Sequence, residues 1–322
     1  MKKSIFFLLV LFASTISFAQ SVKKTMKRLP DTGQNGDYTP TFGEDADYNY
    51  NTPFYILNGN GTTTDTITGL MWQKTDGGEM TIENAAIYCD TLTLGGYTDW
   101  RLPNAHEIFS ILNQSRVNPA IDTNYFTKTT ADYWWSSQRQ AGDSTKVWCA
   151  NAGGGVGNKP KAETISAGGT KRYHVRAVRD ITAPPTVNHF TDNGDGTITD
   201  NLTGLMWTKA LSTDTATWEQ ALNLAEASTL AGYSDWRLPN IKELESWSLN
   251  EEGLTEFQKE YLRFYESLGK IYLDFQIRLK TKNICYQGQA AKSVALNSLI
   301  TSEKQTWQYI VFAGFNALTK AE

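Results

Sequence analysis

The chain has 322 residues, of which 40% are hydrophobic and 20% charged, so it can build packed cores and is not a disordered protein. The net charge of −4 gives no sign of a nucleic-acid partner. Three cysteines and three scattered histidines are too few for a disulfide-built miniprotein or a histidine-rich metal site. The length suits roughly two domains of about 150 residues.

Residues 1–19 have the features of a secretory signal peptide. Lys2 and Lys3 form a charged start, an apolar run extends from Ile5 to Phe12, and a small-x-small cleavage sequence ends at Ala19. The apolar run is too short for a membrane anchor, and no other stretch approaches the ~20 apolar residues of a spanning helix. We therefore expect an exported protein without a transmembrane segment, located in the periplasm, on the cell surface or in the medium.

An internal repeat organises the rest of the chain. Residues 58–72 (NGNGTTTDTITGLMW) and 193–207 (NGDGTITDNLTGLMW) are identical at eleven of fifteen positions. Residues 94–108 (LGGYTDWRLPNAHEI) and 230–244 (LAGYSDWRLPNIKEL) agree at ten of fifteen. The offsets of 135 and 136 residues are far too long for a solenoid, so we interpret the repeat as two tandem copies of one domain.

Local signals predict the same elements in each copy. The Asn-Gly pairs at 58–61 and 193–196 predict tight hairpin turns before Thr-rich strands. Helices are expected after Thr81 and Thr217, and a second helix after Asn104 and Asn240, which follow Arg-Leu-Pro. Copy one continues with strands at 133–137, 145–150 and 173–178. The predicted fold class is α+β, with a mainly antiparallel sheet and two helices in each module.

The motifs TGLMW, GYxDWRLPN, WWSS and VRAVR follow one another in copy one. This combination resembles the bacterial Lcl C-terminal-like domain family, which is named for a collagen-like surface adhesin. The resemblance covers residues 29–180 fully and 186–249 in part. It implies a C-type-lectin-like module and, since the named member binds sulfated glycans, an extracellular glycan or sulfated polysaccharide as the partner.

These features divide the chain into a signal peptide (1–19), an acidic N-terminal linker (20–50), copy one (51–181), an incomplete copy two (182–249) and an atypical tail (250–322). Copy two lacks WWSS and the closing Arg-containing strand. Apolar residues at helical spacing predict an amphipathic helix around 254–281 in the tail. The tail either packs on copy two and completes it, or results from a shifted reading frame. A half-module alone would leave strand edges unpaired.

Tryptophan supplies both core and ligand candidates. Four of the ten tryptophans lie in the repeated motifs and are assigned to the cores: Trp72, Trp100, Trp207 and Trp236. The ligand candidates are Trp134, Trp135 and Trp148. Neighbouring residues of a strand point to opposite faces, so we expect one of Trp134 and Trp135 to be buried and the other exposed, where an indole suits a sugar ring.

A basic segment near the end of copy one is the second candidate ligand site. Residues 159–179 contain one acid, Glu163, and six basic side chains suited to sulfate, carboxylate or phosphate oxygens: Lys159, Lys161, Lys171, Arg172, Arg176 and Arg179. The alternative is a solvated loop and strand that balance the acidic stretch at 31–47.

Signals for catalysis or metal binding are sparse. The Arg-Leu-Pro motif before a helix resembles formylglycine-generating enzymes, which use cysteine chemistry, but Cys89 lies on the buried stripe of a helix. Cys89 and Cys149 either form a disulfide or stay reduced. Residues 192–196 (DNGDG) lack the EF-hand register and are interpreted as a turn. We therefore expect a protein that is not an enzyme and has no cofactor or metal.

Together, these patterns favour an exported bacterial binding protein for carbohydrate or another surface polymer. The alternative is a structural or protein-interaction component of the cell envelope, and an enzyme ranks third. The oligomeric state and the ligand stay open.

Overall fold

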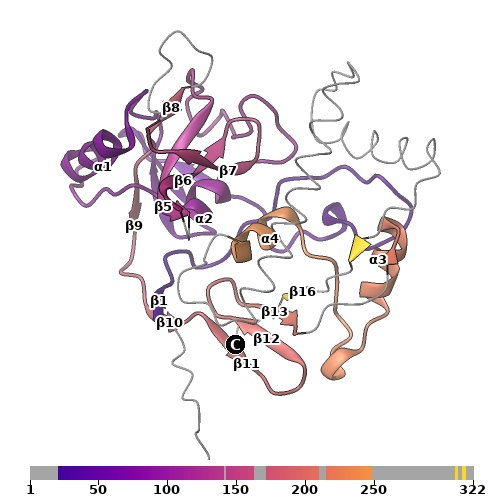
Figure 1. Ribbon diagram of the computed structural model, residues 1–322. Coiled ribbons are helices and arrows are strands. Elements are labelled where there is room, and N and C mark those ends of the chain that lie inside the picture. Colours follow the sequence, from indigo (N-terminus) through magenta and orange to yellow (C-terminus); the bar gives the residue numbers. More distant parts are fainter. Residues whose placement is uncertain are drawn as a thin grey trace, which may run out of the picture.

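The computed structural model describes residues 21–140, 143–162, 172–209, 215–248, 309–310 and 314–316. Figure 1 shows two bodies side by side, which are the two copies of the repeat. The predicted signal peptide and the predicted helix at 254–281 lie outside the described residues.

The first sheet of copy one is antiparallel, with strand order β2-β3-β4-β9. Its strands are β2 (Tyr55–Leu57), β3 (Thr62–Asp65), β4 (Leu70–Gln73) and β9 (Val178–Asp180). The predicted turn joins β2 to β3, and Gly59 and Gly61 adopt φ angles of 76° and 84°, which glycine tolerates best. β9 begins in the VRAVR motif, so the end of copy one pairs with the strand that carries TGLMW.

Two capped helices follow in copy one, as the sequence predicts. In α1 (Ile82–Thr91), the N-cap side chain of Thr81 accepts a hydrogen bond from the backbone N–H of Asn84. In α2 (Ala105–Ser110), Asn104 and Glu107 form a capping box. Both helix starts are therefore determined by local side-chain chemistry.

A second sheet in copy one has the strand order β7-β6-β5-β8. Its strands are β5 (Tyr133–Gln140), β6 (Asp143–Asn151), β7 (Val156–Pro160) and β8 (Tyr173–His174), of which β5 and β8 pair in parallel. One face packs into a cluster that contains Trp72 and Trp134, and the other into a cluster that contains Trp100 and Trp135. This sheet is therefore covered on both sides.

Copy two repeats the first sheet, with strand order β11-β12-β13-β16. Its strands are β11 (Phe190–Asp192), β12 (Thr197–Asp200), β13 (Leu205–Thr208) and β16 (Gly314–Asn316). Leu70 pairs with Asp180 in copy one, and the equivalent Leu205 pairs with Asn316, 136 residues after Asp180. The closing strand of copy two thus comes from the tail, at the same offset as the repeat.

The other elements of copy two follow the same offset. They are β14 (Thr215–Ala216), α3 (Trp218–Glu226), the 3-10 helix η2 (Leu230–Gly232), α4 (Ile241–Ser248) and β15 (Tyr309–Ile310). Thr215 pairs with Ile310, as Glu79 does with His174 in copy one. The helix expected after Thr217 is α3, and Thr217 and Gln220 form a capping box at its start.

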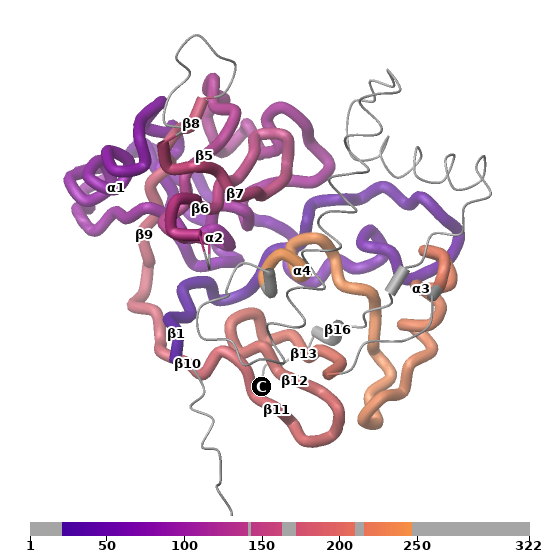
Figure 2. The backbone as a smooth tube through the Cα atoms, viewed as in Figure 1, coloured from indigo at the N-terminus to yellow at the C-terminus, as the bar shows by residue number. Residues whose placement is uncertain are grey.

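The N-terminal segment lies along copy two, although it precedes copy one in the sequence. After β1 (Ser21–Lys23), which pairs with β10 (Thr186–Asn188), it runs past α4 to α3 (Figure 2). We call residues 31–50 the strap; it contains the 3-10 helix η1 (Asp45–Asp47). Asp31 and Asp45 interact electrostatically with Lys242, so these two acids of the stretch lie near a basic side chain of copy two.

The structure confirms a mixed α+β protein with mainly antiparallel sheets and few helices. Trp72, Trp100, Trp207 and Trp236 are buried, as predicted. In the described part of the chain, no helix has the length and apolar character needed to cross a membrane.

Candidate functional site

The two neighbouring tryptophans of β5 are both buried, so the expectation that one of them is exposed is wrong. The Trp134 Nε1 donates to Asp76 Oδ2 at 3.0 Å, and the Trp135 Nε1 donates to the backbone oxygen of Met80 at 2.9 Å. The two side chains do alternate along the strand, but a second layer covers each face. Trp148 is half-buried and is the one predicted tryptophan that retains partial exposure.

The six predicted basic side chains do not share one surface. Arg176 is fully buried, and its Nη1 donates to the backbone oxygens of Gln73 and Lys74 at 2.8 and 2.6 Å. Arg179 is also buried and forks onto Asp99, with Nε–Oδ1 and Nη2–Oδ2 distances of 2.7 and 3.0 Å. Lys171 lies outside the described residues, and three half-buried candidates remain: Lys159, Lys161 and Arg172.

A buried carboxylate, which the sequence does not single out, holds this region together. Asp76 accepts from the Trp134 indole, from Thr129 Oγ1 at 2.6 Å and from the backbone N–H of Gly78 at 3.2 Å. His174 Nδ1 lies 2.9 Å from Asp76 Oδ1, and Arg176 Nη2 lies 3.5 Å from Asp76 Oδ2.

The electrostatic environment of this cluster keeps both Asp76 and Arg176 charged at neutral pH. Burial alone would raise the pKa of Asp76, but the hydrogen bond from His174, the charge of Arg176 and the other donors lower it to about 2. Burial lowers the pKa of Arg176 to about 10, and Asp76 opposes that shift, so the guanidinium stays protonated at neutral pH. Asp76 and Arg176 therefore form a buried ion pair with a structural role.

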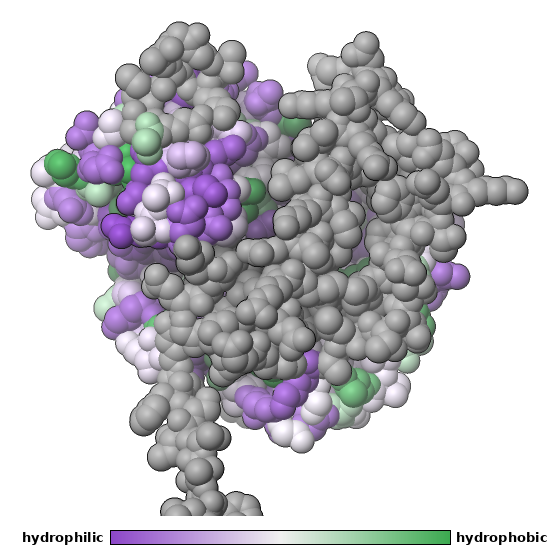
Figure 3. Space-filling view, viewed as in Figure 1, coloured by the Kyte–Doolittle hydropathy of each residue, from purple (hydrophilic) through white to green (hydrophobic). Residues whose placement is uncertain are grey.

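An aromatic stack leads from the core to the surface of the second sheet. The Trp135 and Tyr173 rings stack with centroids 4.6 Å apart, and Tyr173 stacks on Tyr133 at 5.1 Å. The Lys159 ammonium lies 4.8 Å from the centroid of the half-buried Tyr133 ring. The backbone of Arg172 is bonded to that of Tyr133, which brings a second cation to the same end of the sheet. Figure 3 shows mainly hydrophilic atoms over the front of this sheet.

Tyr133 is not among the ligand residues predicted from the sequence. The sequence feature that could have indicated Tyr133 is its position two residues before Trp135, which places both side chains on the same face of β5. We call Tyr133, Lys159 and Arg172 the aromatic–cationic site.

Cys89 and Cys149 are both buried, and no disulfide joins them. Burial and then the charge of Asp90 raise the pKa of the Cys89 thiol to about 12. A thiol with that pKa is almost wholly protonated at neutral pH and is a poor nucleophile. Within the part of the chain that the structure describes, no group of three or more His, Cys, Asp or Glu side chains could hold a metal ion.

The arginine of each Arg-Leu-Pro motif forms a second kind of ion cluster. Arg101 forks onto Glu107 with two bonds of 2.7 Å and onto Asp180 with two bonds of 2.9 Å. The equivalent Arg237 pairs with Glu243, and the Tyr48 and Tyr50 rings of the strap lie 5.3 and 5.8 Å from its guanidinium.

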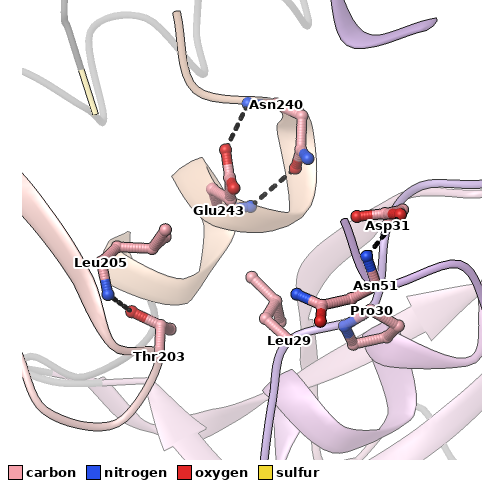
Figure 4. Close-up of a pocket in the computed structure, with 8 residues that line it drawn as sticks. All are labelled: Leu29, Pro30, Asp31, Asn51, Thr203, Leu205, Asn240 and Glu243. Carbon is pink, nitrogen blue, oxygen red and sulfur yellow. Dashed lines mark hydrogen bonds between the residues drawn. The ribbon is translucent and has the colours of Figure 1, made fainter. Parts of the chain in front are cut away.

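A small polar pocket lies where the N-terminal segment meets copy two (Figure 4). It is lined by Leu29, Pro30, Asp31, Asn51, Thr203, Leu205, Asn240 and Glu243. Asn240 and Glu243 are bonded to each other in the start of α4, and Asp31 accepts from the backbone N–H of Asn51, so these groups are already partnered. Beside the pocket, the buried Lys242 donates to the backbone oxygens of Asp31 and Ser110, both at 2.8 Å. This pocket is a structural junction between the strap and the two copies.

Comparison with known proteins gives one family match. The family model described as Lcl C-terminal domain matches residues 61–179 and 196–308, which together make up most of the chain. The second match extends past Leu249, where the quoted motifs stop, into the tail. No curated protein and no solved structure matches the chain.

Proposed function

Because the chain belongs to the Lcl C-terminal domain family, we propose that it is an exported, non-catalytic binding protein for an extracellular carbohydrate or another surface polymer. The C-type-lectin-like character of the module, its carbohydrate partner and its location outside the cytoplasm are parts of this proposal. The alternative is a protein-interaction component of the cell envelope. An enzyme related to formylglycine-generating enzymes is disfavoured because the Cys89 thiol is buried and its pKa is raised.

The observation that supports the proposal best is the aromatic–cationic site. The Tyr133 ring stacks on Tyr173, and the Lys159 ammonium lies 4.8 Å from the centroid of the Tyr133 ring. A fixed ring contacts the apolar face of a sugar, and an adjacent cation pairs with a sulfate or carboxylate substituent. Neither Trp134 nor Trp135 can serve in this way, because both are buried.

The test is binding of the protein to immobilised dextran sulfate, with uncharged dextran as the polymer control. We expect Lys159→Gln to weaken binding by about ten-fold, as loss of one charge-assisted contact implies, and Lys159→Arg to retain it. Binding should weaken as salt rises. The matched control is Lys209→Gln, which removes an exposed cation of copy two that pairs with Asp192. Absent or salt-insensitive binding, or equal losses for Lys159→Gln and Lys209→Gln, would refute the site.

A further inference from the structure

The strap covers one defined face of copy two. Thr39 Oγ1 donates to Glu219 Oε1 at 2.8 Å, and the Tyr48 hydroxyl donates to Glu226. Glu219 and Glu226 lie on α3, seven residues apart and therefore on the same side of the helix. The ring of Tyr48 also lies over Arg237, so one peptide segment satisfies two carboxylates and a guanidinium.

Copy one has the same face, and within the described ranges of the chain no strap lies over it. At the offset of 136 residues, Glu83, Asp90 and Arg101 correspond to Glu219, Glu226 and Arg237. Glu83 and Asp90 are exposed on α1, while 31% of the Arg101 side chain is accessible against 6% for Arg237. The side chains that the strap covers in copy two therefore have equivalents in copy one that are accessible to solvent.

The open face also carries an apolar residue. Ile87 lies four residues after Glu83 and three before Asp90, on the same side of α1, and it is 61% exposed. The opposite side of α1 is buried through Ala85 and Cys89. The exposed side of α1 thus presents an isoleucine flanked by two carboxylates.

We propose that this α1 face of copy one is a docking site for an extended, tyrosine-containing segment of a partner protein, bound as the strap is bound on copy two. The strap seated on the equivalent face defines the chemistry of the occupant: hydroxyl donors for Glu83 and Asp90, and an aromatic ring over Arg101. The strap of the same chain is engaged with α3, and so is that of a second copy. The segment therefore comes from another protein.

One difference between the two copies indicates the charge expected for the partner segment. Arg101 is already paired with two carboxylates, Glu107 and Asp180, whereas the position of Asp180 in copy two is Asn316. The α1 face is therefore more acidic than the α3 face, and we expect its partner segment to be less acidic than the strap.

The experiment uses a synthetic peptide of residues 37–50 that carries Asp37→Asn and Asp45→Asn, titrated into the full chain and followed by NMR. We expect shifts in α1 and not in α3, and about ten-fold weaker binding to the double variant Glu83→Gln, Asp90→Asn. The matched control is Glu219→Gln, Glu226→Gln on α3, which should leave the affinity of the peptide for α1 unchanged.

Three outcomes would overturn the proposal. These are no binding at millimolar peptide, shifts that map outside α1, or equal affinity for the Glu83→Gln, Asp90→Asn variant. Analytical ultracentrifugation of the full chain tests whether the occupant of the α1 face is a second copy of this chain. A dimer that the same two substitutions abolish would assign the face to a second copy of this chain and refute a separate partner. Dextran sulfate binding should not weaken in this variant, because the aromatic–cationic site contains neither residue.

Discussion

Asp76 shows that one buried carboxylate can organise a domain although it is not one of the residues shared by the two copies of the repeat. The equivalent positions in copy two, 211 and 212, are Leu and Ser, so comparison of the copies does not reveal it. Its partners Thr129, His174 and Arg176 lie 53 to 100 residues away in the sequence. Residue spacing in the sequence indicates partners that are close along the chain, and almost all partners of Asp76 are distant along the chain.

Replacing Asp76 with Asn should strongly destabilise copy one. The substitution leaves Arg176 charged and fully buried without its ion partner, which typically costs about 3–5 kcal/mol in the free energy of unfolding. Urea denaturation followed by tryptophan fluorescence measures the loss. Asp192→Asn, which removes the carboxylate of an exposed pair with Lys209, is the control and should have little effect. Equal stability of both variants would show that Asp76 does not hold Arg176 in place.

At the level of elements, the sequence predicts what depends on neighbouring residues. The hairpin turns and the caps at Thr81, Asn104 and Thr217 are predicted and present, because each needs only a few residues in order. The burial of both Trp134 and Trp135 is not predictable from the sequence. The alternation of side chains along a strand tells which face of the sheet each residue lies on, but not which other elements pack on that face. The closing strand of copy two escapes the sequence comparison because its residues share little with VRAVR.

Truncation of the chain after residue 308 should open the first sheet of copy two. It removes β15 and β16 and leaves β13 as an unpaired edge, so amide hydrogens of β12 and β13 should exchange faster. The same hydrogens in β3 and β4 of copy one should be unaffected. A matched control chain ends after residue 316 and keeps both strands. Unchanged exchange in β13 after the shorter truncation would mean that the tail does not close copy two.

For the whole molecule, contacts between charged groups join copy two to copy one and to the N-terminal segment. Asp65 and Asp200 occupy equivalent buried positions in the two first sheets. Asp65 interacts with Lys242 of copy two, and Asp200 interacts with Lys24 of the N-terminal segment. The helices α2 and α4, which are equivalent in the repeat, also pack on each other. None of this follows from either copy alone, and the course of the strap along copy two could not be predicted from its place before copy one.

This arrangement predicts a pH dependence of stability to which Asp200 contributes. Burial raises the pKa of Asp200 from 3.8 to about 6, although Thr203, Leu202 and Lys24 oppose the shift. The folded state therefore binds this proton more tightly than the unfolded state does. The resulting stabilisation is complete below about pH 4 and is lost as the pH rises through about 6.

The measurement compares the free energy of unfolding of the native chain and of Asp200→Asn between pH 4 and pH 7. Asn cannot ionise, so we expect the native chain to lose on the order of 2 kcal/mol relative to the variant across this range. His189 has the opposite dependence, because burial and then His106 lower its pKa to about 4, and its Nε2 lies 3.5 Å from Asp200 Oδ1. Both proteins therefore also carry His189→Gln, so that no histidine titrates beside position 200. Parallel stability curves for the two proteins would contradict the prediction and would mean that Asp200 is ionised in the folded state throughout this range.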